Sequence, residues 1–155
     1  MALIDAPERF EVVAGFPIGA GLSEGYRSTD VSSEWLRELR TATEPDIWRH
    51  GVFAVDRTSG VAVGVGGFKG LPDDTGTVEI AYGVARVQEG LGFATEIAAA
   101  LTAFAFEDPR VTHVIAHTLP ANRASSRVLE KCGFEYTGNV IDPDDGEVCR
   151  WERRE

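Results

Sequence analysis

The feature that most limits the fold of this chain is a glycine-containing turn between a strand pattern and a helix pattern. Residues 77–84 alternate and are rich in β-branched side chains, as a half-buried strand is. Gly90 and Gly92 follow, and residues 93–106 carry one apolar stripe at helical spacing. The alanines of that segment let a helix lie close to a sheet. The sequence therefore predicts a strand, a tight turn and a helix packed on a sheet.

Turn residues divide the remainder of the chain into further elements. Helices are predicted over 32–39 and 122–131, the second with Asn122 as N-cap and Gly133 as terminator. Strands are predicted over 9–13, 51–56, 61–68, 111–118, 134–140 and 147–153. This order predicts an α+β fold with one open, mixed, mostly antiparallel sheet and helices on both faces. A length of 155 residues fits one domain, 1–155.

The charge balance limits the partners. The formal net charge is −10, so nucleic-acid phosphates are repelled, whereas a cationic amine is attracted. A simple alternative is that the charge only keeps the protein soluble. The chain opens without a basic secretion-type start and contains no run of about eighteen apolar residues. We therefore expect a cytoplasmic protein with no nucleic-acid or membrane partner.

The cysteines and histidines do not have the spacing of metal ligands. Cys132 and Cys149 form no CxxC pair, and Cys132 lies in an apolar pattern typical of a core residue. His113 and His117 lie in a segment that alternates like a strand, with no further ligand nearby in sequence. We expect no metal site.

The glycine turn has the chemistry of a phosphate site. The first amides of a helix are unpaired, and the helix dipole adds partial positive charge there. Gly90 and Gly92 let an anion approach the backbone, Ala94 is small, and Thr95 offers a hydroxyl. A dinucleotide-binding motif would need a third glycine where Thr95 stands, and a phosphate-binding Walker loop would need GK[ST]. The remaining alternative is that these glycines serve only to turn the chain.

Four segments together resemble the GNAT superfamily of N-acetyltransferases, in particular the branch related to the ribosomal-protein N-acetyltransferases. They are Val78–Val84, Glu89–Glu96, Val114–Pro120 and Asn122–Phe134. The resemblance runs from about Val52 to Trp151. It implies a GNAT fold with a splayed sheet, acetyl-CoA as acetyl donor, and direct attack by a primary amine. The acceptor is a small-molecule amine or a peptide or protein N-terminus, and a homodimer is left open.

The resemblance also assigns the cofactor-binding residues, within a cofactor-binding part at about 76–135. The family's glycine motif aligns with residues 89–94, which gives the pyrophosphate contacts to Gly90, Leu91, Gly92, Phe93 and Ala94, and the Thr95 hydroxyl would add a donor beside them. Glu89 stands where the family has a basic or amide side chain, so backbone amides must hold the anion. Val84 would hydrogen-bond the pantetheine arm through its backbone. Asn122 would cap its helix and contact the arm.

Glu79 and Ser125 are the candidate catalytic residues. Glu79, on the strand that leads to the turn, would remove the amine's proton directly or through water; the alternative is a solvent-facing strand residue. Ser125 belongs to an Asn-x-x-Ser pattern and would stabilise the leaving thiolate. Leu129 stands where many family members have a tyrosine acid. Arg127 and Lys131 reach cofactor phosphates or form a solvated helix face. Glu89 and Leu129 favour the alternative of a CoA-sensing protein, and a CoA-free interaction domain is a third hypothesis.

Overall fold

The computed structural model describes residues 15, 17–20, 22, 37 and 40–155. The predicted strand 9–13 lies outside those residues, as does the predicted helix 32–39 except for residue 37. The elements, in chain order, are α5 (Ile47–His50), β1 (Val52–Val55), β2 (Ala62–Phe68), β3 (Thr77–Val84), the 3-10 helix η2 (Arg86–Gln88), α6 (Phe93–Phe106), β4 (His113–Thr118), α7 (Arg123–Lys131), β5 (Glu135–Asp142) and β6 (Gly146–Arg154). No helix among the described residues has both the length and the apolar character needed to cross a bilayer.

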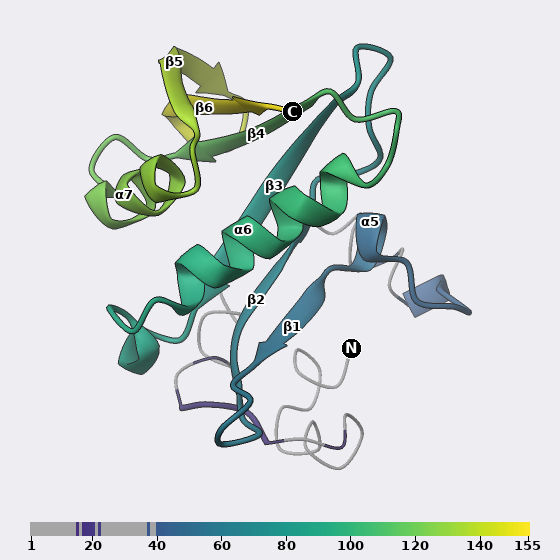
Figure 1. The fold of residues 1–155 in the computed structure, drawn as a ribbon, viewed down its shortest axis with the longest axis vertical. Helices are drawn as coiled ribbons and strands as arrows, with labels where there is room; N and C mark the ends of the chain where they lie inside the picture. The colour runs from purple at the N-terminus through teal and green to yellow at the C-terminus, as the bar shows by residue number, and fades with distance from the viewer. Residues whose placement is uncertain (1–14, 16, 21, 23–36, 38–39) are drawn as a thin grey trace.

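The strands form one six-stranded sheet in the order β1-β2-β3-β4-β6-β5 (Figure 1). Among these six strands of the described part of the chain, only β3 and β4 pair in parallel, and every other neighbouring pair is antiparallel. Parallel neighbours need a long crossover, and α6 lies in the one that joins β3 to β4. The predicted α+β class with an open, mixed and mostly antiparallel sheet is confirmed.

The sheet divides between its two parallel strands. Residues 77–79 of β3 pair with residues 113–115 of β4, and the pairing ends at Glu79 and Ile115. Beyond that point β3 stays with β2, and β4 stays with β6. Figure 1 shows β3 and β4 starting together and separating towards α7. The sheet is therefore splayed, as the resemblance implied.

Helix α6 packs across β2 and β3 because β2 is rich in glycine. A Cβ on Gly66 would lie 2.7 Å from Ile97 Cγ2 and 2.9 Å from Leu101 Cδ1. The helix buries Ile97, Ala98, Leu101 and Ala105 in the main core. Residues without side chains in β2 and small residues in α6 thus bring the helix onto the sheet, which fixes where its N-terminus lies.

Helix α7 begins and ends where its sequence predicts. The Asn122 side chain accepts a hydrogen bond from the Ser125 amide at 3.1 Å. After the helix, Gly133 has a φ of 80°, and the Phe134 amide donates to the Leu129 carbonyl at 3.0 Å. Positive φ at this position suits glycine because it has no Cβ. The N-cap and the glycine terminator are both confirmed.

Candidate functional site

The splay leaves one edge of β3 facing an opening. The Ala81 and Gly83 positions lie in register with Gly67 and Val65 of β2, and the Ala85 amide donates to Val63. Antiparallel ladders alternate, so these odd-numbered residues direct their backbone groups to β2. The amides and carbonyls of Tyr82 and Val84 consequently face the other edge, which β4 has left. This is the edge that the sequence analysis assigned to the pantetheine arm through Val84.

At the end of that edge, the glycine turn leads into α6. Gly90 and Gly92 have φ values of 77° and 94°, in the left-handed region that glycine favours. Within the described part of the chain, the amides of Gly90, Leu91, Gly92, Phe93 and Ala94 donate to no backbone acceptor. The Thr95 amide bonds the Gly92 carbonyl at 3.0 Å, so it is already used. The turn and the helix N-terminus therefore present a row of free donors.

The space around these glycines is open. A Cβ at Gly90 or at Gly92 would meet no atom within 4 Å. Leu91 is also exposed, at 65%. Neither glycine is required by crowding from the rest of the protein, although both have positive φ. Glu89 ends η2 in an extended conformation and is exposed, so its carboxylate has room to turn away from the amides.

Ser125 lies beside a tyrosine hydroxyl. Tyr82 Oη is 3.0 Å from Ser125 Oγ, and it also lies 3.4 Å from the Ser125 carbonyl oxygen. Burial raises the pKa of Tyr82, against the opposing effect of its hydrogen bond with Ser125. The phenol is therefore protonated throughout the neutral range and is available as a donor. This pair joins β3 to α7 across the splay.

The Glu79 side chain is half-buried, and its carboxylate contacts one cationic side chain and one imidazole. Its Oε1 atom lies 2.7 Å from Lys69 Nζ and 3.0 Å from His117 Nδ1. Burial opposes the charge on Lys69, but the hydrogen bond and the attraction to Glu79, with help from Asp142 and Asp145, raise the pKa of Lys69. Glu79 is thus not a free solvent-facing carboxylate. It forms the centre of a cluster with Lys69, which directly follows β2, and His117 of β4.

The structure brings the predicted residues together in two groups rather than one. Val84 and residues 90–95 follow one another from the free edge of β3 into α6, and Ser125 and Asn122 lie at the start of α7. Tyr82 links these to β3. Glu79, with its odd number, lies on the opposite face of β3 from the buried Ile80.

The sequence analysis assigned no role to the side chain of Tyr82, and it did not place Lys69 or His117 in the site. The alternation of β3 held a signal for Tyr82, because that residue shares a face with the buried Val78 and Ile80. For the other two residues there was no local signal, because their contacts with Glu79 depend on the strand register; the contact of His117 joins positions 38 residues apart.

Leu129 and Cys132 are core residues. Leu129 is 0% exposed, so the position where family members have a tyrosine acid is filled by packing. Cys132 is buried, burial raises the pKa of its thiol, and its Sγ lies 3.5 Å from the Thr95 carbonyl. Among the described residues, no group of three or more His, Cys, Asp or Glu side chains is placed to hold a metal ion.

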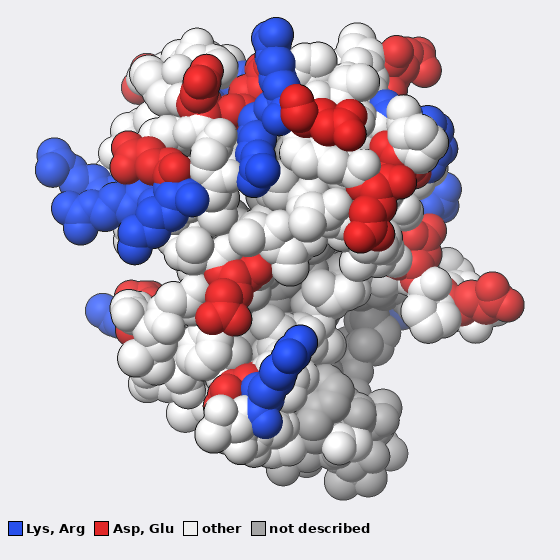
Figure 2. Space-filling view, in the orientation of Figure 1, with Lys and Arg blue, Asp and Glu red and all other residues white. Residues whose placement is uncertain are grey.

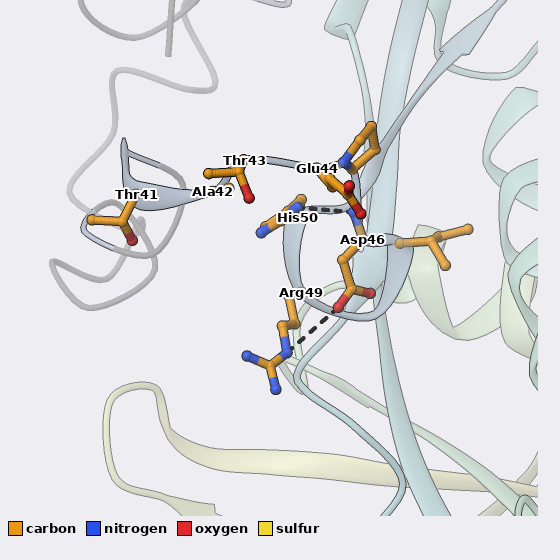
Figure 3. A pocket seen from close by; sticks show the side chains of 9 residues that line it. Thr41, Ala42, Thr43, Glu44, Asp46, Arg49 and His50 are labelled. Carbon is orange, nitrogen blue, oxygen red and sulfur yellow. Dashed lines mark hydrogen bonds and ion pairs between the residues drawn. The ribbon is translucent and has the colours of Figure 1, made fainter.

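A surface cavity of about 570 Å³ lies elsewhere, beside α5 (Figure 3). Residues 41–47, 49 and 50 line it, and none of the predicted site residues does. Asp46 organises this segment: it accepts from the Trp48 amide at 2.9 Å, and its carboxylate lies 3.5 Å from Arg49 Nε. These contacts explain the short helix without a ligand.

Charged side chains are unevenly distributed on the face seen in Figure 2. Basic residues gather at α7, on the left of the view. Arg123, Arg127 and Lys131 recur every four residues and are exposed, so they share one side of the helix. Exposure of all three fits the solvated face that was one of the two readings of Arg127 and Lys131.

Fold and site define a class of protein: a mixed sheet splits between two parallel strands, and a glycine turn at the end of one presents free helix amides. A family model described as an acetyltransferase (GNAT) domain matches residues 11–135. The match covers well over half of the chain. The chain belongs to the GNAT acetyltransferase family.

Sequence relatives include aminoglycoside-modifying proteins. The kanamycin resistance protein of Rhizobium radiobacter is 37% identical over 68 residues, which is 44% of this chain and 63% of that protein. The aminoglycoside N(6')-acetyltransferase type 1 of Klebsiella pneumoniae is 37% identical over 68 residues, 44% of this chain and 34% of that enzyme. The matched stretch is thus less than two thirds of each relative's length.

Solved structures show the same fold. The aminoglycoside acetyltransferase AAC(6')-Ib in complex with paromomycin and acetyl-CoA matches with a TM-score of 0.59 and 27% identity, over 66% of this chain and 63% of that one. The ribosomal-protein-S5-alanine acetyltransferase of Vibrio fischeri has a TM-score of 0.59 at 15% identity, over 66% and 59% of the two chains. The second likeness concerns the fold alone.

Proposed function

We propose that this protein is an acetyl-CoA-dependent N-acetyltransferase that moves an acetyl group to a primary amine. The observation that carries the proposal is the continuity of donors from the free edge of β3 at Tyr82 and Val84 to the free amides of residues 90–94. An extended arm that ends in a pyrophosphate matches such a track, because the arm needs strand-like partners and the anion needs a helix N-terminus. The complex of AAC(6')-Ib with acetyl-CoA supports this choice of ligand.

In this proposal, residues 76–135 hold the cofactor. The amides of Gly90, Leu91, Gly92, Phe93 and Ala94 bind the pyrophosphate, and the Thr95 hydroxyl adds a donor. The backbone of Val84 pairs with the arm. The Asn122 Oδ1 atom is used in the α7 cap, so its contact with the arm falls to Nδ2.

Transfer requires loss of a proton from the amine and stabilisation of the leaving thiolate. Glu79 is the carboxylate whose negative charge drives proton removal, directly or through a neighbouring group. Ser125 stabilises the thiolate by hydrogen bonding, and Tyr82 supplies the proton to this pair. A backbone amide on the free edge of β3 polarises the acetyl carbonyl.

The acceptor we propose is a cationic small-molecule amine of the aminoglycoside kind. The aminoglycoside-modifying relatives support it, and the chain's net charge of −10 attracts such a cation. Asp142 and Asp145 at the β5–β6 turn act on Lys69 beside Glu79, so acidic groups lie near the proton-accepting cluster. A peptide N-terminus is the alternative, which the ribosomal-protein resemblance favours.

The test measures thiol release from acetyl-CoA in the presence of kanamycin or of peptides with free N-termini. The proposal predicts release that depends on an amine and is faster with kanamycin. Faster release with peptides would show that the acceptor is a peptide N-terminus and would leave the proposed acetyltransferase activity intact. If no amine stimulates release while acetyl-CoA still raises the melting temperature, the protein is a CoA-binding sensor and the proposed activity is wrong.

A further inference from the structure

His117 contacts the same carboxylate oxygen as Lys69. Its Nδ1 atom lies 3.0 Å from Glu79 Oε1, and Lys69 Nζ lies 2.7 Å from that oxygen. The side chains of His117 and Glu79 are only 16% and 18% exposed, whereas Lys69 is 49% exposed. Lys69 thus closes the solvent side of the cluster, and His117 lies on its inner side.

The carboxylate fixes which nitrogen of the imidazole carries the proton. A carboxylate beside an ammonium group only accepts hydrogen bonds, so neutral His117 donates from Nδ1. Its Nε2 atom then has a free lone pair. Nε2 is buried and has no hydrogen-bond partner within the described part of the chain. A buried polar atom without a partner destabilises the folded state, so its presence calls for an explanation such as a ligand or a catalytic role.

His117 lies in the sheet at the point where β3 and β4 separate. The pairing of β3 with β4 ends at Glu79 and Ile115. His117 is the next residue of β4 on the same face, and in continued register it would lie opposite Ala81. It therefore stands where the two strands begin to separate. An arm that runs from the glycine turn along Val84 and Tyr82 has its reactive end towards the same place.

We propose that His117 Nε2 is the atom that takes the proton from the acceptor amine, and that Glu79 is the positioning residue that holds the imidazole in the required tautomer. The inference rests on the proposed acetyl transfer. It changes the part played by Glu79, from the base itself to the group that orients and stabilises the base. The arrangement follows the logic by which a carboxylate orients a histidine base in hydrolytic triads.

In the proposed step, the acceptor amine loses two protons and gains the acetyl group. The acceptor arrives as an ammonium ion, and Nε2 takes one proton, which leaves the neutral amine. The amine nitrogen bonds to the thioester carbonyl carbon, and the carbon–sulfur bond breaks. The second proton of the nitrogen ends on the thiolate through the Tyr82–Ser125 hydroxyls, which gives the free thiol and the amide. The imidazolium then releases its proton to solvent.

Charged groups surround the imidazole on each neighbouring strand. Glu79 and Asp142 bring negative charge near His117, and Lys69 and Arg150, which lies in register with His117 on β6, bring positive charge. Glu152 lies on the same face of β6, paired with Ile115. Because only the neutral imidazole accepts a proton, the proposal predicts that kcat/KM rises with pH.

The kinetic test compares pH profiles of kcat/KM for acetyl-CoA and kanamycin. We expect His117→Gln to lose the rising limb and about 100-fold or more in rate at neutral pH. His113→Gln, on the same strand and face, should keep the limb. Glu79→Gln should move the limb to lower pH, because loss of a negative charge disfavours the imidazolium. A limb that survives in His117→Gln and disappears in Glu79→Gln would overturn the inference and make Glu79 the base.

A structural test does not need activity. In 15N-labelled full-length protein at alkaline pH, the imidazole that disappears in His117→Gln should show a proton on Nδ1 and none on Nε2. A proton on Nε2 would overturn the inference whether or not the chain transfers acetyl groups. Failure of the proposed function would instead appear as a wild-type chain that releases no thiol with any amine.

Discussion

At the scale of single residues, the contact between Tyr82 and Ser125 is the least expected feature of the site. The family's usual tyrosine position holds Leu129, which is fully buried. A tyrosine hydroxyl nevertheless reaches the start of α7, from β3 and not from α7 itself. In the proposed mechanism the hydroxyl that supplies the proton would therefore come from β3 and not from α7.

Replacing Tyr82 by Phe tests that role. The variant keeps the ring that packs against the core and removes the hydroxyl, so the acetyl-CoA-induced rise in melting temperature should be unchanged. We expect kcat to fall about tenfold, the factor that corresponds to one hydrogen bond of about 1.4 kcal/mol. Thiol-release kinetics measure it. The double variant Tyr82→Phe with Ser125→Ala should lose less kcat than the product of the two single-variant factors. Fully additive effects on the activation free energy would contradict a shared function.

At the scale of elements, the turn between α6 and β4 is held by one side-chain pair. Arg110 donates from Nη2 to Asp108 Oδ2 at 2.7 Å and from Nε to Asp108 Oδ1 at 3.0 Å. These bonds, with one from the Arg110 amide, lower the pKa of Asp108 to about 2. The turn returns the chain from α6 to the start of the parallel strand pair.

Asp108→Asn should destabilise the protein in a pH-dependent manner. The folded-state pKa lies below the unfolded one, so the pair stabilises the fold above about pH 4 and loses that effect as pH falls towards 2. Urea midpoints of wild type and variant should differ at pH 7 and converge near pH 2. Asp74→Asn, an exposed turn carboxylate, is the control. A difference that does not depend on pH would show that ionisation of Asp108 is not the cause.

Elements with strong local signals could be predicted from sequence. The bounds of β3 and α6 match the prediction, because glycines and a proline punctuate them, and α7 begins after Asn122 as its capping chemistry requires. The predicted strand 111–118 begins two residues late, at His113, since Val111 and Thr112 bond into the Asp108 and Gly76 turns instead. Local turn chemistry there competes with strand propensity.

At the scale of the whole molecule, the candidate site depends on strand order and register. Glu79 and His117 belong to β3 and β4, and Lys69 directly follows the end of β2 at Phe68. Their contacts follow from an antiparallel pair beside a parallel one. Nothing local to any of the three residues predicts the cluster. The glycine turn could be found because its residues are contiguous, whereas the proton-accepting cluster could not.

The central claim is that the splayed edge and the glycine turn bind acetyl-CoA. If the chain is instead an interaction domain that binds no CoA, acetyl-CoA should leave its melting temperature unchanged. A ligand that binds only the folded state stabilises it by about 2.7 kcal/mol at 100 times its dissociation constant, so the melting temperature must rise.

The decisive measurement is thermal unfolding with and without millimolar acetyl-CoA, for wild type, Gly92→Ala and Gly60→Ala. Both glycines have positive φ, 94° and 70°, and open space at Cβ, so each substitution carries a comparable strain of about 1–2 kcal/mol. Only Gly92 faces the proposed pyrophosphate. We expect acetyl-CoA to raise the melting temperature of wild type and Gly60→Ala by the same amount and that of Gly92→Ala by much less. The absence of a shift in wild type, or equal shifts in all three, would contradict the claim.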